Sequence, residues 1–225
     1  MDGNGRWAEQ RGLPRTDGHT AGEQALFEVL DSADELGVGW FTVYAFSTEN
    51  WRRPVDEVQF LLQFNEEILL GRQEELHERN IRIRFIGRRD RRVPRRLVRR
   101  MEEAAALTCD NTGLTFTIAF NYGGRAELVD AVQRIVDAGT KRVSEKTIAR
   151  NLYDPEMPDP DLVIRTSGEY RVSNFLLWEL AYSELVFSEA LWPDFRRQHL
   201  YAAIKEFQDR DRRYGGGVGP DESTG

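Results

Sequence analysis

The residues with the clearest capacity for chemistry open the chain, where Asp2-Gly3-Asn4-Gly5-Arg6 forms a glycine-rich segment. Glycines let the backbone approach a ligand closely, and free N–H groups at the start of a helix attract anions. Asp2 could hold a divalent cation, while Arg6, Arg15 and His19 could contact diphosphate oxygens. An Asp or Asn beside glycine is more often only a turn or a helix cap, so this interpretation needs support from other positions.

A second polar cluster runs from Ser47 to Arg53 and follows directly on the apolar run from Trp40 to Phe46. Such a run is typical of a strand buried on both faces. Ligands of open α/β sheets bind beyond the carboxyl ends of the strands, so the cluster stands where a site is expected. The alternative is an ordinary capping loop.

A third cluster, from Arg165 to Asn174, also follows a strand-like segment, Asp161 to Ile164. It contains two arginines, three Ser or Thr residues and a glycine. The planar fork of arginine matches phosphate oxygens, so this cluster could bind a second diphosphate. Two anion sites at the same edge of a sheet predict two phosphorylated substrates.

The segments that must position these clusters alternate between strand-like and helix-like patterns. This predicts a single α/β domain with a mostly parallel central sheet, flanked by helices on both faces. Further strand-like runs are Ile81 to Gly87, Leu114 to Asn121 and Leu185 to Phe187. Apolar residues at helical spacing predict helices over about 25–36, 57–79, 128–136 and 195–213.

We expect the domain to span residues 1–214 and the Gly-rich, acidic residues 215–225 to form a disordered tail. No strand precedes the turn at Asp2, so we also expect that an N-terminal strand is missing. In the helix over 57–79, Phe60 and Phe64 widen the apolar face beyond what a surface helix needs. Either the helix is deeply buried or, with the strand Leu114 to Phe120, it lines an apolar tunnel for a hydrocarbon.

Composition limits the classes of protein to consider. The 225 residues are 40% hydrophobic and 31% charged, with one cysteine, Cys109, and no secretory signal or membrane-spanning run. We expect a cytoplasmic protein with at most peripheral membrane contact. The net charge of -7 disfavours nucleic-acid binding. The arginines between Arg88 and Arg100 share their segment with an apolar stripe, which indicates the solvated face of a helix.

Several blocks together resemble, in chain order, the signature blocks of cis-prenyltransferases, the undecaprenyl diphosphate synthase family. These blocks are residues 1–8, 46–51, 121–125 and 165–175, followed by Glu184. The resemblance implies that Asp2 is linked to Mg²⁺, that Glu184 is a second acid associated with the metal, and that Ser47 and Asn50 lie near the reacting carbons. Arg213-Tyr214-Gly215 resembles an element that completes the active site of the partner in a homodimer.

The family also implies which residues bind the two substrates. The backbone from Gly3 to Arg6 and the side chains of Arg15, His19 and Arg53 would bind the allylic diphosphate. Arg165, Arg171 and Ser173 match the isopentenyl diphosphate site. The complete predicted substrate-binding set is Gly3, Asn4, Gly5, Arg6, Trp7, Arg15, His19, Ser47, Trp51, Arg53, Arg165, Arg171 and Ser173.

The resemblance implies an Mg²⁺-dependent enzyme that adds isopentenyl diphosphate to farnesyl or geranyl diphosphate, giving a long-chain product such as undecaprenyl or decaprenyl diphosphate. One alternative is a short-chain Z-farnesyl diphosphate synthase. Another is a non-catalytic partner subunit. Such a subunit would be expected to lack the metal aspartate or the arginines of the second anion site, but this chain has all of them: Asp2, Arg6, Arg165 and Arg171. The chain has no DDxxD segment, the metal-binding element of trans-prenyltransferases, so that chemistry is not expected.

Overall fold

In the computed structural model the described residues are 1–210, apart from the side chains of residues 68–70. The expected tail over 215–225 and the segment Arg213-Tyr214-Gly215 therefore lie outside the described residues. Within them, no helix is long and apolar enough to cross a membrane. The strands are β1 (Trp40–Ser47), β2 (Arg82–Ile86), β3 (Thr115–Tyr122), β4 (Leu162–Arg165) and β5 (Glu184–Phe187).

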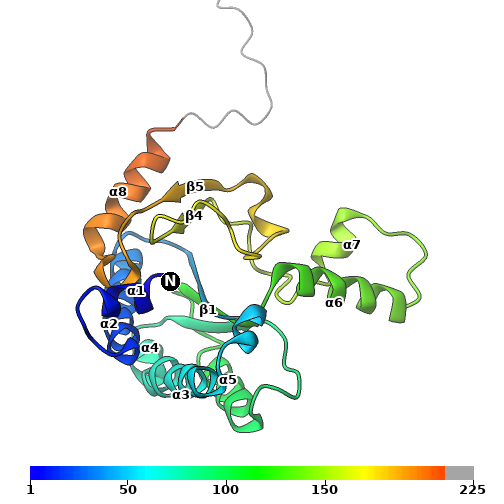
Figure 1. Cartoon of the computed structure of the whole chain (residues 1–225). Helices are drawn as coiled ribbons and strands as arrows, with labels where there is room; N and C mark the ends of the chain where they lie inside the picture. The colour runs from blue at the N-terminus through cyan, green and yellow to red at the C-terminus, as the bar shows by residue number, and fades with distance from the viewer. Residues whose placement is uncertain (211–225) are drawn as a thin grey trace, which may run out of the picture.

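The strands pair only in parallel, as the alternating pattern predicts, but they form two sheets rather than one. One sheet has the order β1-β3-β2, and the other joins β4 to β5. Figure 1 shows the β4–β5 pair crossing above β1. Every residue of β3 is buried, because this central strand has a neighbour on each side, whereas β4 is only half-buried.

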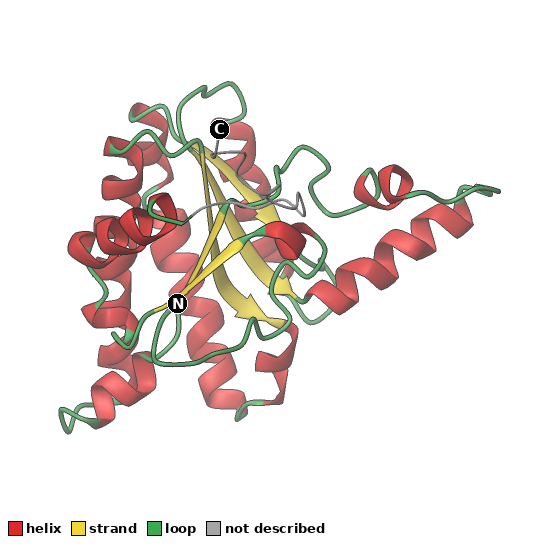
Figure 2. Cartoon of the chain, turned by 90° about the horizontal axis from the view of Figure 1, so that it is seen from above, coloured by secondary structure: helices red, strands yellow, loops and turns green. Residues whose placement is uncertain are grey.

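Helices surround the two sheets. The longer ones are α2 (Arg15–Glu35), α3 (Val55–Gly71), α5 (Arg95–Leu107), α6 (Gly124–Asp137) and α8 (Arg197–Gln208). The short ones are α1 (Asn4–Glu9), α4 (Gln73–Glu78) and α7 (Glu145–Ala149), with 3-10 turns η1 (Thr48–Arg52), η2 (Glu179–Tyr182) and η3 (Trp192–Asp194). In both views α6 and α7 extend away from the body of the molecule (Figure 2).

The single helix expected over 57–79 is in fact two helices. They meet at Arg72, whose backbone leaves the helical region with φ -108° and ψ 15°. Gly71 weakens the helix just before this point, because glycine loses more backbone entropy on ordering than other residues. The Arg72 guanidinium lies 3.8 Å over the Phe27 ring and donates to Glu75, which favours the break.

A cavity of about 1400 Å³ lies between the two sheets and extends to α2, α3 and α8. Its apolar walls include the edge strand β1, together with Leu61 and Phe64 of α3. The expected tunnel wall is therefore partly wrong: Phe60 does not line the cavity, and neither does the strand Leu114 to Phe120. That strand is central in its sheet, so its side chains are used in the core.

Candidate active site

Asp2 is held at the end of β4 by its backbone and its carboxylate. The Thr166 hydroxyl lies 3.2 Å from the Asp2 nitrogen and 3.1 Å from the Asp2 carbonyl oxygen. The Trp192 N–H donates to the same carbonyl at 2.9 Å. The Asp2 carboxylate, 44% exposed, accepts a 3.0 Å bond from Arg165. The first turn of the chain is therefore joined to the polar cluster after β4, far away in sequence.

The backbone after Asp2 turns sharply into α1. Gly3 has φ 105°, a conformation that other residues rarely adopt, and a Cβ at this position would lie 2.8 Å from the Ser167 hydroxyl. The Asn4 Oδ1 atom is buried without a hydrogen-bond partner among the described residues. This glycine-rich turn thus brings a polar amide group to the cavity that Asn4 lines.

Arg165 lies at the centre of the cluster after β4. One of its nitrogens donates to the Ser173 hydroxyl at 2.6 Å and to the Arg171 carbonyl oxygen at 2.5 Å, while another donates to Asp2. Glu169 contacts the two neighbouring guanidinium groups, Arg6 at 3.3 Å and Arg171. Five expected site residues, Asp2, Arg6, Arg165, Arg171 and Ser173, therefore converge, and Glu169 balances part of their charge.

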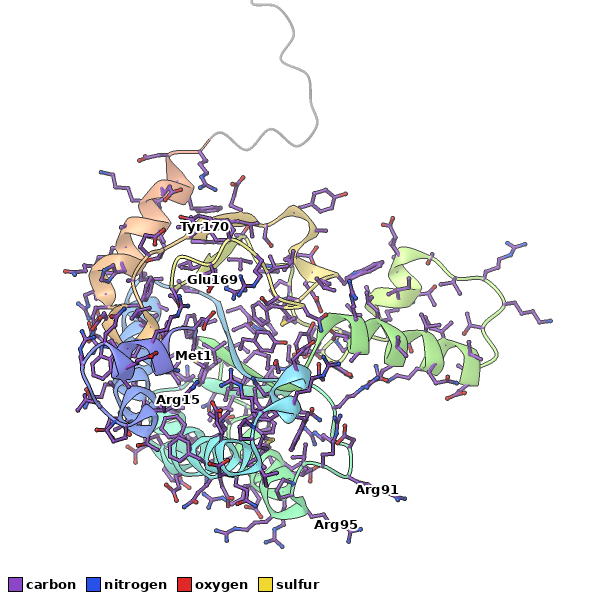
Figure 3. The ribbon with its side chains drawn as sticks, in the orientation of Figure 1. Met1, Arg15, Arg91, Arg95, Glu169 and Tyr170 are labelled. Atoms are coloured by element: carbon purple, nitrogen blue, oxygen red, sulfur yellow. The ribbon has the colours of Figure 1, made fainter. Side chains whose placement is uncertain are left out.

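A separate group of basic residues lies on the α2 and α3 side. The carboxylate of Glu57 accepts from Arg53 at 2.7 Å and lies 3.4 Å from Arg15. The Arg15 guanidinium also lies against Gly5, where a Cβ would approach it to 2.9 Å. A side chain at this position would displace the Arg15 guanidinium from where it now lies. The three predicted residues Gly5, Arg15 and Arg53 all line the cavity. Figure 3 labels Arg15 of this group and Glu169 of the cluster after β4.

His19 lies between this basic group and the apolar wall. Its ring is 5.6 Å from that of Phe60 and 5.7 Å from that of Phe64. Burial, and then the nearby charge of Arg53, lower the pKa of His19 to about 4. Without a ligand, the histidine is therefore neutral at pH 7.

The loop after β1 presents Ser47 and Asn50 to the cavity. The Ser47 N–H donates to the Asn50 side-chain oxygen at 2.7 Å, so both residues also cap the short helix η1. The amide nitrogen of Asn50 keeps its capacity to donate. Both interpretations made from the sequence, a capping loop and a site loop, describe this segment.

Two predicted substrate-binding tryptophans do not line the cavity. The Trp7 indole N–H donates to Asp194 at 2.7 Å, and the Trp51 indole N–H donates to Asn121 at 2.7 Å. Neither ring lines the cavity, in contrast to the neighbouring Arg6 and Asn50. Helical and 3-10 geometry turns adjacent residues to different sides, so each tryptophan fixes its segment against the body of the protein.

Glu184 is not brought to Asp2 within the chain. It pairs with Leu162 at the start of β4, whereas Asp2 contacts Arg165 at the end of that strand. Its carboxylate instead accepts a 2.8 Å bond from Arg210. Asp2 and Glu184 of the same chain therefore lie at opposite ends of the β4–β5 pair, and this arrangement does not fit a metal ion bound by both carboxylates.

The donor set at Asp2 still fits Mg²⁺. This ion keeps several waters in proteins and needs only one or two carboxylates when substrate phosphates supply further oxygens. The Asp2 Oδ1 atom lies 4.0 Å from the Arg6 guanidinium, and the Asp2 side chain is 44% exposed, so this oxygen has capacity for a ligand. No group of three or more metal-ligating side chains occurs among residues 1–210.

Sequence reasoning missed residues that complete the cluster through long-range contacts. Glu57 and Glu169 carry no separate signal, although Glu57 stands four residues after Arg53 and such pairs meet on a helix. Thr166 was counted only as one of the hydroxyl residues of the cluster from Arg165 to Asn174, without its contact to Asp2. Asn174 was included only as the end of a segment. Its side chain donates to Glu49 at 2.9 Å and thereby links the loop after β1 to the loop after β4.

An α/β domain with two arginine-rich anion sites and an apolar cavity defines a class of enzyme that joins phosphorylated substrates carrying hydrocarbon. The comparisons specify the family. Residues 1–215 match the prenyltransferase family described as "Putative undecaprenyl diphosphate synthase". The chain belongs to this family and is a cis-prenyltransferase.

Similar proteins are known from sequence and from structure. A Thermobifida fusca protein named trans,polycis-polyprenyl diphosphate synthase ((2Z,6E)-farnesyl diphosphate specific) is 53% identical, over 100% of this chain and 83% of its own length. Decaprenyl diphosphate synthase of Mycobacterium leprae is 47% identical, over 96% of this chain and 74% of its own length. Lavandulyl diphosphate synthase from Lavandula x intermedia, whose crystal structure is in complex with dimethylallyl diphosphate, is 33% identical in sequence. The two structures match with a TM-score of 0.91, over 96% of this chain and 95% of that chain.

Proposed function

We propose that this prenyltransferase condenses isopentenyl diphosphate with an allylic diphosphate to build a long-chain Z-polyprenyl diphosphate. The observation that carries the proposal is the 3.0 Å contact between Arg165 and Asp2, because it joins two anion sites beside the apolar cavity. A reaction between two diphosphates that lengthens a hydrocarbon needs both features together.

The two sites are assigned to the two substrates by their surroundings. Arg15 and Arg53, with the backbone at Gly3 to Arg6, would bind the allylic diphosphate, since they stand beside the apolar wall formed by Leu61 and Phe64. Arg165, Arg171 and Ser173 would bind isopentenyl diphosphate. Ser47 and Asn50 would lie near the reacting carbons.

Catalysis by this site would depend on charge stabilisation. The arginines neutralise negative charge that develops on the departing diphosphate, and a position in a partly dry cavity strengthens this effect. Mg²⁺, held by Asp2 and diphosphate oxygens, would supply further neutralisation. The apolar lining protects the cation-like allylic carbon from water until the isopentenyl double bond attacks it.

We propose a farnesyl primer and a product of undecaprenyl or decaprenyl length. The names of the Thermobifida fusca and Mycobacterium leprae relatives support this choice. The cavity of about 1400 Å³ also supports it, because pockets for ordinary small ligands hold about 300–1,000 Å³.

The deciding experiment supplies radiolabelled isopentenyl diphosphate and Mg²⁺ with geranyl, (2E,6E)-farnesyl or (2Z,6E)-farnesyl diphosphate, and separates products by chromatography. We expect efficient use of a farnesyl primer and long products. Products that end at farnesyl diphosphate would instead identify a short-chain enzyme. No incorporation with any primer would favour a non-catalytic partner subunit.

Phe64 and Phe60 test the cavity as the determinant of product length. They are the same residue type one turn apart on α3, but only Phe64 lines the cavity. Phe64→Ala should lengthen the product distribution, because it enlarges the space for the chain, while Phe60→Ala should leave it unchanged. Equal effects of the two substitutions would contradict the assigned wall.

We also propose a homodimer. Val129, Val132 and Val136 of α6 are 62%, 50% and 64% exposed, and their spacing places them on one face of this projecting helix. The side chain of Tyr182 is also 80% exposed. A second copy of the chain is a suitable cover for such a face. Light scattering should give a dimer, and Val132→Glu should weaken it more than the matched surface change Val143→Glu.

A further inference from the structure

Thr166 is the first residue after β4, and it is only 3% exposed. Its hydroxyl accepts a hydrogen bond from the Asp2 N–H at 3.2 Å and donates one to the Asp2 carbonyl at 3.1 Å. A single side-chain oxygen thus contacts both backbone polar groups of one residue, 164 positions away in the chain. The arrangement fixes the backbone of Asp2 at two points.

The neighbouring residue acts on the other end of Asp2. Arg165 contacts the carboxylate at 3.0 Å, so consecutive residues hold the side chain and the backbone of the same aspartate. The Asp2 side chain is 44% exposed, and therefore packing restricts it only in part. Its position depends on where the backbone is held.

The identity of residue 166 matters for a chemical reason. A hydroxyl both donates and accepts, whereas valine has the same shape and can do neither. Loss of the hydroxyl would leave the Asp2 N–H without this acceptor in a mostly buried place. A displacement of about 1 Å at a reacting group can cost about 10²-fold in rate.

We propose that Thr166 is a positioning residue that sets the affinity of the site for the metal–diphosphate complex by holding the backbone of Asp2. The proposal rests on the role given to Asp2 in the proposed function. Thr166 itself does not contact the substrate or the ion in this role, and acts only through the aspartate.

The test compares Thr166→Val with Thr166→Ser, which keeps the hydroxyl. Thr166→Val should raise the Mg²⁺ concentration for half-maximal activity at least about tenfold, as loss of a hydrogen bond to a critical group does. Thr166→Ser should restore it to within about threefold of wild type. Thr115→Val is the control, because Thr115 is another buried threonine, but it lies at the start of β3 in the other sheet and does not line the cavity.

Binding without turnover gives a second readout. We expect inorganic diphosphate with Mg²⁺ to raise the melting temperature of wild type and Thr166→Ser, and to raise that of Thr166→Val much less. The melting temperature without ligand reports any loss of folding. An unchanged Mg²⁺ dependence and an unchanged ligand shift in Thr166→Val would overturn the proposal, and so would a failure of Thr166→Ser to restore them.

Asp2→Ala separates this inference from the proposed function. If Asp2→Ala removes the Mg²⁺-dependent shift and Thr166→Val does not, only the role of Thr166 is wrong. If Asp2→Ala itself keeps the full shift, the metal role of Asp2 is wrong and the inference fails with it.

Discussion

Two clusters of charged and polar residues lie beyond the ends of strands from different sheets, β4 and β3, and they differ in how their carboxylates are paired and buried. At the end of β4, Asp2 and Glu169 stand beside guanidinium groups, with side chains 44% and 24% exposed. Beyond the end of β3, Glu127 and Glu179 are 1% and 3% exposed. The nearest partner of Glu127 is the Tyr122 hydroxyl rather than an arginine.

The carboxylates of the buried pair, Glu127 and Glu179, have raised pKa values. Burial, and then the charge of Glu127, raise the pKa of Glu179 to about 7. Burial also raises the pKa of Glu127. The comparison teaches that the cluster at β4 pairs partly exposed carboxylates with arginines, so that one partner can be exchanged for a ligand, whereas burial at the β3 cluster raises the pKa values of both glutamates. Only the first arrangement suits a substrate site.

Removing Asp2 should have the largest effect. Asp2→Ala should lower turnover about 10²-fold or more, since it removes the carboxylate that positions the metal on the diphosphates. Steady-state incorporation of isopentenyl diphosphate measures this. Asp194→Ala, at another acid near α1, is the control. Retention of more than about a tenth of activity in Asp2→Ala would contradict the metal role.

The buried pair should respond in stability rather than in turnover. The raised pKa of Glu179 means that its contribution to the free energy of unfolding is complete below the unfolded pKa of 4.5 and is lost as the pH rises through about 7. The side chain introduced by Glu179→Gln cannot ionise, so the stability of this variant relative to wild type should be about 3 kcal/mol greater at pH 8 than at pH 4.

Urea unfolding at the two pH values measures this gain. Glu145→Gln, an exposed position on α7, is the control and should show no such pH dependence. If the stability of Glu179→Gln followed the wild-type pH profile, the raised pKa of Glu179 would be contradicted.

Substitutions of Arg171 and Arg165 test the proposed division between the two anion sites. Arg171 is 61% exposed and contacts Glu169, while Arg165 also contacts Asp2. Arg171→Ala should raise the KM for isopentenyl diphosphate about tenfold and change the allylic KM little, because it removes one charge-assisted hydrogen bond. Arg165→Ala should weaken both substrates. An equal effect of Arg171→Ala on both KM values would remove the division between the two anion sites.

The smallest effect concerns the turn between the β4 strand and the site. Ser167 has φ 74°, and its buried hydroxyl lacks a hydrogen-bond partner among residues 1–210. Ser167→Gly should therefore stabilise the protein by about 0.5–1 kcal/mol. Ser173 also has positive φ, 46°, but its hydroxyl accepts from Arg165. Thermal melts with assays should show that Ser173→Gly loses activity and Ser167→Gly does not.

The positions of the strands could be predicted from the sequence because buried parallel strands are continuous apolar runs. The expected strand 114–121 corresponds to β3 (Thr115–Tyr122), and 161–165 corresponds to β4 (Leu162–Arg165). The break at Arg72 was missed, since it depends on the guanidinium stacking on Phe27 of α2. Periodicity within one segment carries no information about such a contact.

The arginines of the site could be predicted from the sequence, but the hydrogen-bond partners of its side chains could not. Arg165 and Ser173 were found because basic and hydroxyl residues follow a strand. Trp7 was assigned to the substrate because of its neighbours, although its indole bonds Asp194. Thr166 and Asp2 are 164 residues apart, and their contact depends on how the chain returns from β4 to its beginning. Local pattern cannot predict which partner a polar side chain selects across such a distance.

The central place of Arg165 has a thermodynamic consequence. Its guanidinium bonds both Asp2 and Ser173, so one cation is shared between the two substrate sites. A ligand that draws Asp2 away from Arg165 changes the charge available to the other site. Linkage then requires reciprocity: whatever factor the occupant of one site applies to the affinity of the second, the second applies to the first. If the two clusters bind the two substrates as proposed, each substrate would therefore be a heterotropic effector of the other.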